Sequence, residues 1–245
     1  MEHDLSFLFC ALLMLVAFLY SSVGHGGASG YLALMALYEF TPEVMRPTAL
    51  LLNIFVSAIA FTSYFKSGSF SWKLFLPLAI TAVPAAYIGG LITPPTMLYK
   101  QLLGAFLIIP AIRFIFPSES PNVRRNELNI YLALLMGAGI GLVSGVLGIG
   151  GGIILSPLLI MLGWSDVKQA AAVSSLFILV NSIAGLTGRL QQGLNFSPDM
   201  VIMVGIALVG GACGSYFGAF RFNQKTLKIC LSVVLFIASL KLLFS

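Results

Sequence analysis

Apolar stretches, most of them about as long as a membrane-crossing helix, follow one another along almost the whole chain. About 20 apolar residues are needed to cross the ~30 Å hydrocarbon core of a bilayer. Only 9% of the residues are charged, against about 25% in an ordinary soluble domain. We therefore expect an all-α, polytopic transmembrane helical bundle that is embedded in a lipid bilayer. The apolar stretches cover residues 5–20, 30–40, 44–65, 72–92, 97–116, 128–143, 149–163, 167–188, 199–220 and 226–244.

Two glycine-rich interruptions stand at corresponding places in the two halves of the chain. Residues 24–30 read Gly-His-Gly-Gly-Ala-Ser-Gly, and residues 148–152 read Gly-Ile-Gly-Gly-Gly. The stretches that follow, 30–40 and 149–163, are too short to span comfortably and have the length of half-helices. A break in a membrane helix exposes backbone groups that lipid cannot satisfy, so it must line a cavity or be buried by protein. Paired breaks of this kind indicate a transporter's substrate site.

The order of motifs around the breaks predicts an internal repeat. We expect a first transmembrane repeat over 1–117, a cytoplasmic loop over 118–127 and a second repeat over 128–245. Each repeat would contain a glycine-broken helical hairpin and three transmembrane helices. If each broken segment forms a hairpin that enters and leaves on the same side, nine of the 13 Lys and Arg residues lie at one end of the bundle. If the broken segment crosses the membrane once, seven of them lie at one end and six at the other. Positive residues concentrate on the cytoplasmic side. This favours inverted repeats with both termini outside the cytoplasm.

The breaks have the chemistry of an anion site. The first N–H groups of a new helix lack intrahelical partners and carry the positive end of the helix dipole. Glycine lets an anion approach those amides closely. Neutral hydroxyl and amide side chains on the following helices would complete the site, and Thr48 and Ser174 are favoured because each lies about one turn into the helix that follows a half-helix. The alternative is that the glycines only allow close helix packing and the polar side chains bond neighbouring carbonyls. The predicted substrate-binding residues are Gly24, His25, Gly26, Gly27, Ser29, Thr48, Asn53, Gly148, Gly150, Gly151, Gly152, Ser174, Ser175 and Asn181.

His25 is the one strongly titratable residue that the pattern places deep in the membrane, because all eight carboxylates fall near segment ends. An intramembrane histidine is a candidate for proton coupling. The alternative is a neutral histidine that bonds a backbone carbonyl of the break. Basic residues at segment ends, such as Arg46 and Arg189, are expected mainly to fix topology.

Catalytic and metal chemistry are not indicated. Cys10, Cys213 and Cys230 lie in separate apolar stretches without metal-type spacing. We expect no enzyme activity, no metal and no cofactor. Because the Lys and Arg residues lie at segment ends, we expect no nucleic-acid partner.

The motifs around both breaks resemble the TauE/SafE sulfite exporter family. In the first half the resemblance is carried by Gly24–Gly30 with the following Tyr31-Leu32-Ala33-Leu34, by Arg46-Pro47-Thr48-Ala49 and by Asn53. In the second half it is carried by residues 145–152, Pro157, residues 170–175 and Gly185. The resemblance covers essentially the whole chain. The first half departs from the commoner Gly-x-Gly-Gly-Gly pattern, because Ala28 and Ser29 follow Gly27.

The resemblance implies a secondary transporter of a small sulfur-containing anion such as sulfite, sulfoacetate or a related organosulfonate. The leading hypothesis is export by alternating access across a bacterial-type cytoplasmic membrane, with His25, by its position, as the first candidate for any proton coupling. The residues leave open a passive anion channel, the uptake of thiosulfate or sulfate, and a sulfur relay through the three cysteines. They also leave the oligomeric state open.

Overall fold

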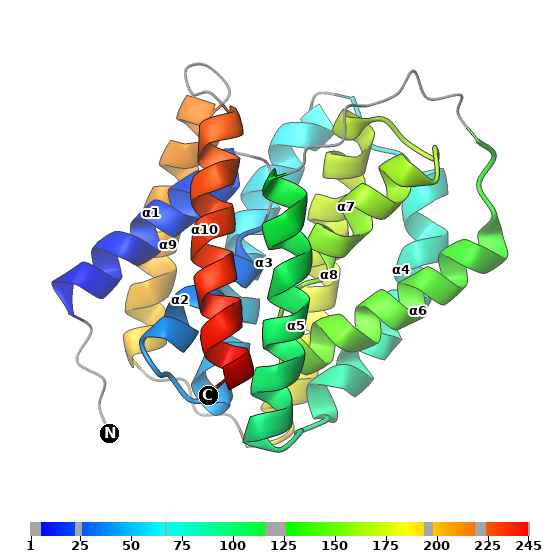
Figure 1. The fold of residues 1–245 in the computed structure, drawn as a ribbon. Coiled ribbons are helices and arrows are strands. Elements are labelled where there is room, and N and C mark those ends of the chain that lie inside the picture. Colours follow the sequence, from blue (N-terminus) through cyan, green and yellow to red (C-terminus); the bar gives the residue numbers. More distant parts are fainter. Residues whose placement is uncertain are drawn as a thin grey trace.

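The computed structural model describes residues 6–22, 26–66, 68–115, 126–193, 198–218 and 224–244. These residues form helices joined by turns and short extended links, so the expected all-α class is confirmed (Figure 1). The helices are α1 (Phe7–Ser22), α2 (Ala28–Leu37), α3 (Pro42–Lys66), α4 (Trp72–Leu91), α5 (Thr96–Ile115), α6 (Ile130–Leu147), α7 (Gly152–Met161), α8 (Val167–Leu190), α9 (Pro198–Gly218) and α10 (Gln224–Phe244).

Local sequence sets several of the helix boundaries. The side chain of Asp166 accepts a hydrogen bond from the backbone N–H of Gln169 at 2.8 Å, which caps α8. The side chain of Asn129 accepts one from Leu132 at 3.1 Å and caps α6 in the same way. The two half-helices are confirmed as separate helices, since α2 and α7 each contain 10 residues.

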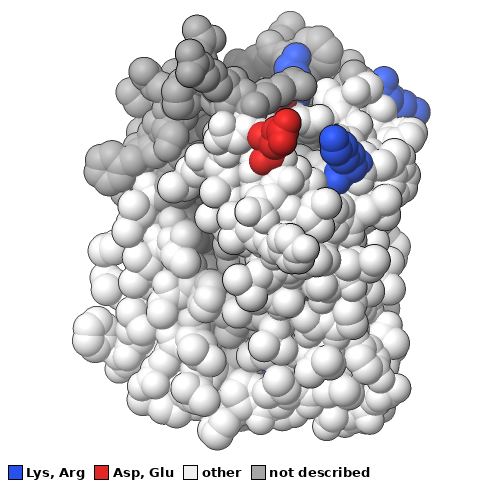
Figure 2. All heavy atoms as spheres, turned by 90° about the vertical axis from the view of Figure 1, so that its right-hand side faces the viewer, with Lys and Arg blue, Asp and Glu red and all other residues white. Residues whose placement is uncertain are grey.

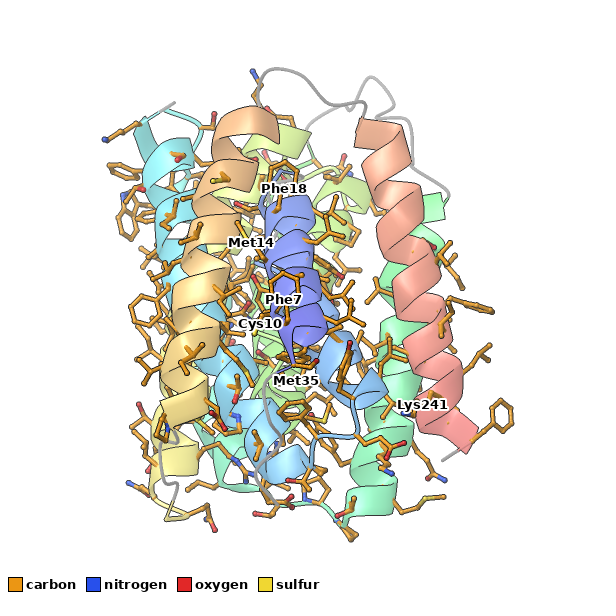
Figure 3. All side chains as sticks on the ribbon, turned by 90° about the vertical axis from the view of Figure 1, so that its left-hand side faces the viewer. Phe7, Cys10, Met14, Phe18, Met35 and Lys241 are labelled. Atoms are coloured by element: carbon orange, nitrogen blue, oxygen red, sulfur yellow. The ribbon has the colours of Figure 1, made fainter. Side chains whose placement is uncertain are left out.

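The outer surface of the bundle suits a lipid environment. Within the described residues, four helices, α3, α4, α6 and α8, are long and apolar enough to cross a membrane. In Figure 2 the Lys, Arg, Asp and Glu side chains gather at one end of the face shown, and the remainder of that face is almost entirely uncharged. On α1, Phe7 and Met14 are exposed and point outward (Figure 3). Together with the apolar composition, this surface shows an integral membrane protein.

Helix pairs from the two halves of the chain pack closely through glycine. α4 packs along α6, and α1 packs along α9. At both contacts, a Cβ added to a glycine would collide with a backbone carbonyl of the neighbouring helix, so the absence of a side chain allows the close approach. These contacts join Gly137 to Leu78, Gly141 to Ala82, Gly145 to Ala86, Gly210 to Met14 and Gly214 to Phe18. A Cβ added to Gly139 would meet no atom within 4 Å, so close helix packing does not account for a glycine at this position.

α3 and α8 pack against each other in the middle of the bundle and contact helices of both halves. They differ from the outer helices in carrying many buried polar side chains. These are Thr48, Asn53 and Ser57 on α3, and Ser174, Ser175, Asn181 and Ser182 on α8. The polar interior of the protein therefore lies along this helix pair.

Candidate functional site

Both glycine breaks end in a left-handed glycine directly before a half-helix. Gly27 has φ 84° before α2, and Gly151 has φ 80° before α7. In the second break Gly148 and Gly150 are also left-handed, with φ 82° and 72°. This region is accessible to glycine at little cost and strained for other residues. The helices are therefore interrupted at these positions because glycine adopts the left-handed conformation at little energetic cost. Two predicted site residues, Gly24 and His25, lie outside the described residues.

The two breaks meet at the side chain of Asn53, in the middle of α3. A Cβ added to Gly26 would lie 3.2 Å from Asn53 Oδ1, and a Cβ added to Gly150 would lie 2.5 Å from Asn53 Nδ2. Ile178 on α8 contacts the same two glycines, at 3.1 and 2.9 Å from the added Cβ atoms. One amide and one branched apolar side chain therefore lie between breaks that are more than 120 residues apart in sequence.

A small cavity lies at this meeting point. Its volume is about 10 Å³, which is room for about one water molecule. None of the described residues that line it is charged. They come from both breaks and from both central helices: Tyr20, Gly26, Gly27, Ala28, Ser29, Asn53, Ile149, Ile153 and Ile178. A multi-atom ligand would enter only if the breaks and the central helices moved apart.

Several buried polar atoms around the breaks lack a hydrogen-bond partner. They include both side-chain polar atoms of Asn53, both of Asn181 and the hydroxyl of Ser182. The Ser182 hydroxyl lies 3.1 Å from a Cβ added to Gly150. A buried unsatisfied polar group costs about 1–3 kcal/mol. A hydrogen bond from water or from a polar ligand would remove this cost, so a polar group that reached the centre of the bundle would be stabilised there.

The predicted hydroxyl residues divide into two groups. Ser29 lines the cavity, and its hydroxyl shares a hydrogen bond of 2.8 Å with the Tyr20 hydroxyl. By contrast, Thr48 donates to the Val44 carbonyl at 2.6 Å, and Ser175 donates to the Ala172 carbonyl at 2.7 Å. Ser174 accepts a hydrogen bond of 2.8 Å from Ser156 on α7.

These three hydroxyls thus have partners within the protein, and none of them lines the cavity. Gly148 contacts the backbone of Arg46, and Gly151 and Gly152 contact apolar side chains. The structure brings Gly26, Gly27, Ser29, Asn53 and Gly150 together and leaves the other described candidates around them.

Sequence reasoning did not select Tyr20, Ile178 or Ser182. Tyr20 lies in the last turn of α1, directly before the first break, and an aromatic hydroxyl at that position could have been noticed. Ser182 follows the selected Asn181 on α8. Ile178 carries no polar group, and nothing in the sequence separates it from the other apolar residues of its helix.

A larger cavity of about 310 Å³ lies at the end of the bundle, between the end of α2 and the helices α3, α5 and α10. It includes no glycine of either break. Lys241 at its edge donates to Glu39 at 3.1 Å and to the Leu37 carbonyl at 3.0 Å, so this lysine ties α10 to the end of α2 (Figure 3). Size alone therefore does not identify the functional site, and the polar chemistry lies at the breaks.

Two arginines that the sequence suggested as topology anchors are buried. Arg46 is 1% exposed and Arg189 is 6% exposed. Arg46 Nη2 donates to the Ile92 carbonyl at 2.8 Å, and its guanidinium lies 5.4 Å from the centre of the Tyr99 ring. Arg189 Nη1 is 3.4 Å from the Thr93 hydroxyl. An anchor at the membrane surface needs no such burial.

Comparisons with known proteins agree with these features. Residues 9–242 match the family described as Sulfite exporter TauE/SafE. The chain is 37% identical over 240 residues to the probable membrane transporter protein y4hK of Sinorhizobium fredii, covering 94% of each chain. It is 29% identical over 245 residues to the probable membrane transporter protein YdhB of Bacillus subtilis, covering 95% of this chain and 98% of that protein.

A more distant relative is the probable membrane transporter protein MJ0441 of Methanocaldococcus jannaschii, at 29% identity over 208 residues, with 80% of this chain and 77% of that protein covered. No solved structure matches the chain. With a family match over nearly its full length and membrane transporters as its relatives, the chain belongs to the TauE/SafE sulfite exporter family.

Proposed function

We propose that this protein is a secondary transporter of a small sulfur-containing anion, such as sulfite, sulfoacetate or a related organosulfonate, which binds between the two glycine breaks. The observation that carries the proposal is the Asn53 amide. It is fully buried, it lacks a hydrogen-bond partner, and its two polar atoms contact one break each. An anion at this point would accept hydrogen bonds from Asn53 Nδ2 and from the amides that begin α2 and α7.

The chemistry of the lining favours a small anion over a cation. The first amides of two half-helices provide partial positive charge, which falls off beyond the first turn. Among the residues that the structure describes, no member of the cavity lining carries a carboxylate that would hold a cation. Neutral amide and hydroxyl donors bind an oxyanion without the tight ion pair that would slow its release.

The arrangement of helices supports two inverted repeats over 1–117 and 128–245. α1–α5 and α6–α10 follow the same order of lengths, with 10-residue half-helices in second place. α4 packs on α6 and α9 packs on α1, which are equivalent contacts with the two halves exchanged. In Figure 1, α2 lies in the lower part of the bundle and α7 in the upper part. In this proposal both termini lie outside the cytoplasm and loop 118–127 faces it.

The small volume of the cavity supports alternating access over a permanently open pore. A volume of about 10 Å³ admits no sulfur oxyanion, so transport requires the site to open toward one side at a time. We propose export across a cytoplasmic membrane, the direction that the family description names. His25 is the proposed residue for proton coupling.

The experiment is uptake by proteoliposomes of labelled sulfite, sulfate, thiosulfate and a sulfonate, each with and without a pH gradient. We expect saturable flux of sulfite or the sulfonate, and a His25→Gln variant that loses any stimulation by the gradient. Absence of flux for all four anions would refute the proposed function. Flux that does not saturate and that carries large currents would show that the protein is a passive anion channel and not a transporter.

A further inference from the structure

Arg46 and Arg189 are two buried cations without an ion-paired carboxylate in the described part of the chain. The two side chains reach adjacent residues of the link between α4 and α5, since Arg46 bonds Ile92 and Arg189 approaches Thr93. Their positive charges act on each other, so the two guanidinium groups lie in the same region. Each is more than nine-tenths buried.

Burying a cation is costly unless it is paired, and burying two together is more so. Within the described part of the chain, neither arginine forms an ion pair, because the one such pair there joins Lys241 to Glu39. Glu43 acts on both arginines electrostatically from an exposed position. Arg46 Nε has no hydrogen-bond partner. The Tyr99 ring and one carbonyl compensate Arg46 in part, and a bound anion would complete the compensation.

The pair is aligned with the cavity along the two central helices. Arg46 precedes Asn53 by seven residues on α3, and Arg189 follows Ser182 by seven on α8. Seven residues are almost two helical turns, so each arginine lies on the same helix face as its polar partner and about 10 Å away along the axis. The backbone of Arg46 also lies 3.1 Å from a Cβ added to Gly148, at the start of the second break.

We propose that Arg46 and Arg189 form a second anion-binding site, which holds a small oxyanion beneath the α4–α5 link before or after its passage through the central cavity. The identity of the anion rests on the proposed function; the site itself does not. Two planar guanidinium groups provide several donors in a geometry that matches an oxyanion with two or more oxygens. Among the described residues, the opposite end of the central helix pair has no comparable buried cations, since Lys66 at the end of α3 and Lys168 at the start of α8 are exposed.

The test isolates this site by first removing the Asn53 amide. Equilibrium binding of labelled sulfite and labelled sulfate is measured on purified, delipidated Asn53→Leu protein. We expect residual saturable binding of at least one of the two anions. Adding Arg46→Gln or Arg189→Gln should weaken that binding by about tenfold or more, the effect of losing a hydrogen bond to a charged group. Lys100→Gln removes one positive charge at the same end of the bundle and should leave the affinity within about twofold.

One further variant, and the use of Arg189→Gln beside Arg46→Gln, protect the test against misfolding. Arg46→Lys keeps the charge while losing the planar fork, and should give an intermediate affinity. Arg189→Gln removes the arginine whose contact in the structure is a single long one to a hydroxyl, so folding is least at risk there. Size-exclusion chromatography checks that each variant is folded.

The proposal is overturned if the Asn53→Leu protein binds neither anion, or if both glutamine variants bind as tightly as their parent. It is also overturned if phosphatidylglycerol displaces the labelled anion, because the arginines then hold a lipid headgroup. Failure of the unmodified protein to transport any sulfur anion, with binding to Asn53→Leu retained, would refute the proposed function and leave this site standing.

Discussion

The two glycine breaks occupy equivalent places in the chain, yet they tolerate change differently. In the second break, Gly148, Gly150 and Gly151 are all left-handed, and Gly150 lies against the Asn53 amide. In the described part of the first break, only Gly27 is left-handed, and Gly26 contacts mainly the flexible end of Ile178. The second break is therefore held by backbone conformation at several positions, whereas the first relies more on adaptable side chains. Similar motifs need not give equally rigid structures.

The largest effect is expected for Gly150→Leu. The new side chain would fill the space next to Asn53 and would require a backbone conformation that costs about 1–2 kcal/mol outside glycine. The strain alone corresponds to a factor of about five to thirty. The side chain that fills the space next to Asn53 adds to this loss, so we expect anion flux in proteoliposomes to fall by about 100-fold or more. Gly139→Leu is the control, since Gly139 faces open space. Equal loss of flux in both variants would contradict the special role of Gly150.

A smaller effect is expected for Gly26→Ala than for Gly150→Ala. At Gly26 the backbone is not left-handed, and the nearest atom to the new methyl group is the end of Ile178 at 3.1 Å. A few-fold loss of flux should therefore accompany Gly26→Ala, against a loss of about tenfold or more for Gly150→Ala, where left-handed strain adds to the contact. Flux measured at saturating substrate, with expression and folding matched, tests this order. The reverse order would show that the comparison of the two breaks is wrong.

Ser29→Ala should have a still smaller effect. The change removes a cavity-lining hydroxyl and its hydrogen bond to Tyr20, which costs about 0.5–1.5 kcal/mol. We expect the affinity for the transported anion to weaken by about three- to tenfold, as measured from the concentration dependence of flux. Tyr20→Phe removes the other hydroxyl of the pair. If either variant raised the affinity, the hydroxyl pair would not be part of the binding surface.

The smallest effects should come from Thr48→Val and Ser175→Ala. Both hydroxyls bond carbonyls of their own helices, so their removal leaves the cavity lining unchanged. Flux should stay within about twofold of the unmodified protein, since helix-internal hydroxyl bonds contribute little. A large loss in either variant, with folding intact, would extend the site beyond the meeting point of the breaks.

The sequence was sufficient to predict the helices, but it was not sufficient to predict which side chains on those helices face the site. Lengths of apolar stretches and the two glycine runs predicted α2 and α7 as short helices, because lipid and glycine constrain the backbone directly. α3 and α8 are surrounded by other helices, so hydrophobic periodicity does not mark which face points to the site. For that reason sequence position favoured Thr48 and Ser174, while in the structure it is Asn53 that lines the cavity and contacts both breaks.

The most direct test of a shared site between the breaks compares sulfite or sulfonate binding by the unmodified protein, Asn53→Leu and Asn53→Asp. Leucine removes the donor, and aspartate places a carboxylate of nearly the same size where the anion would lie. We predict that binding at the central site is weakened by about tenfold or more in Asn53→Leu and further in Asn53→Asp, with both proteins folded. Unchanged affinity in both variants would contradict the account, because the anion would then bind without touching the residue that joins the two breaks.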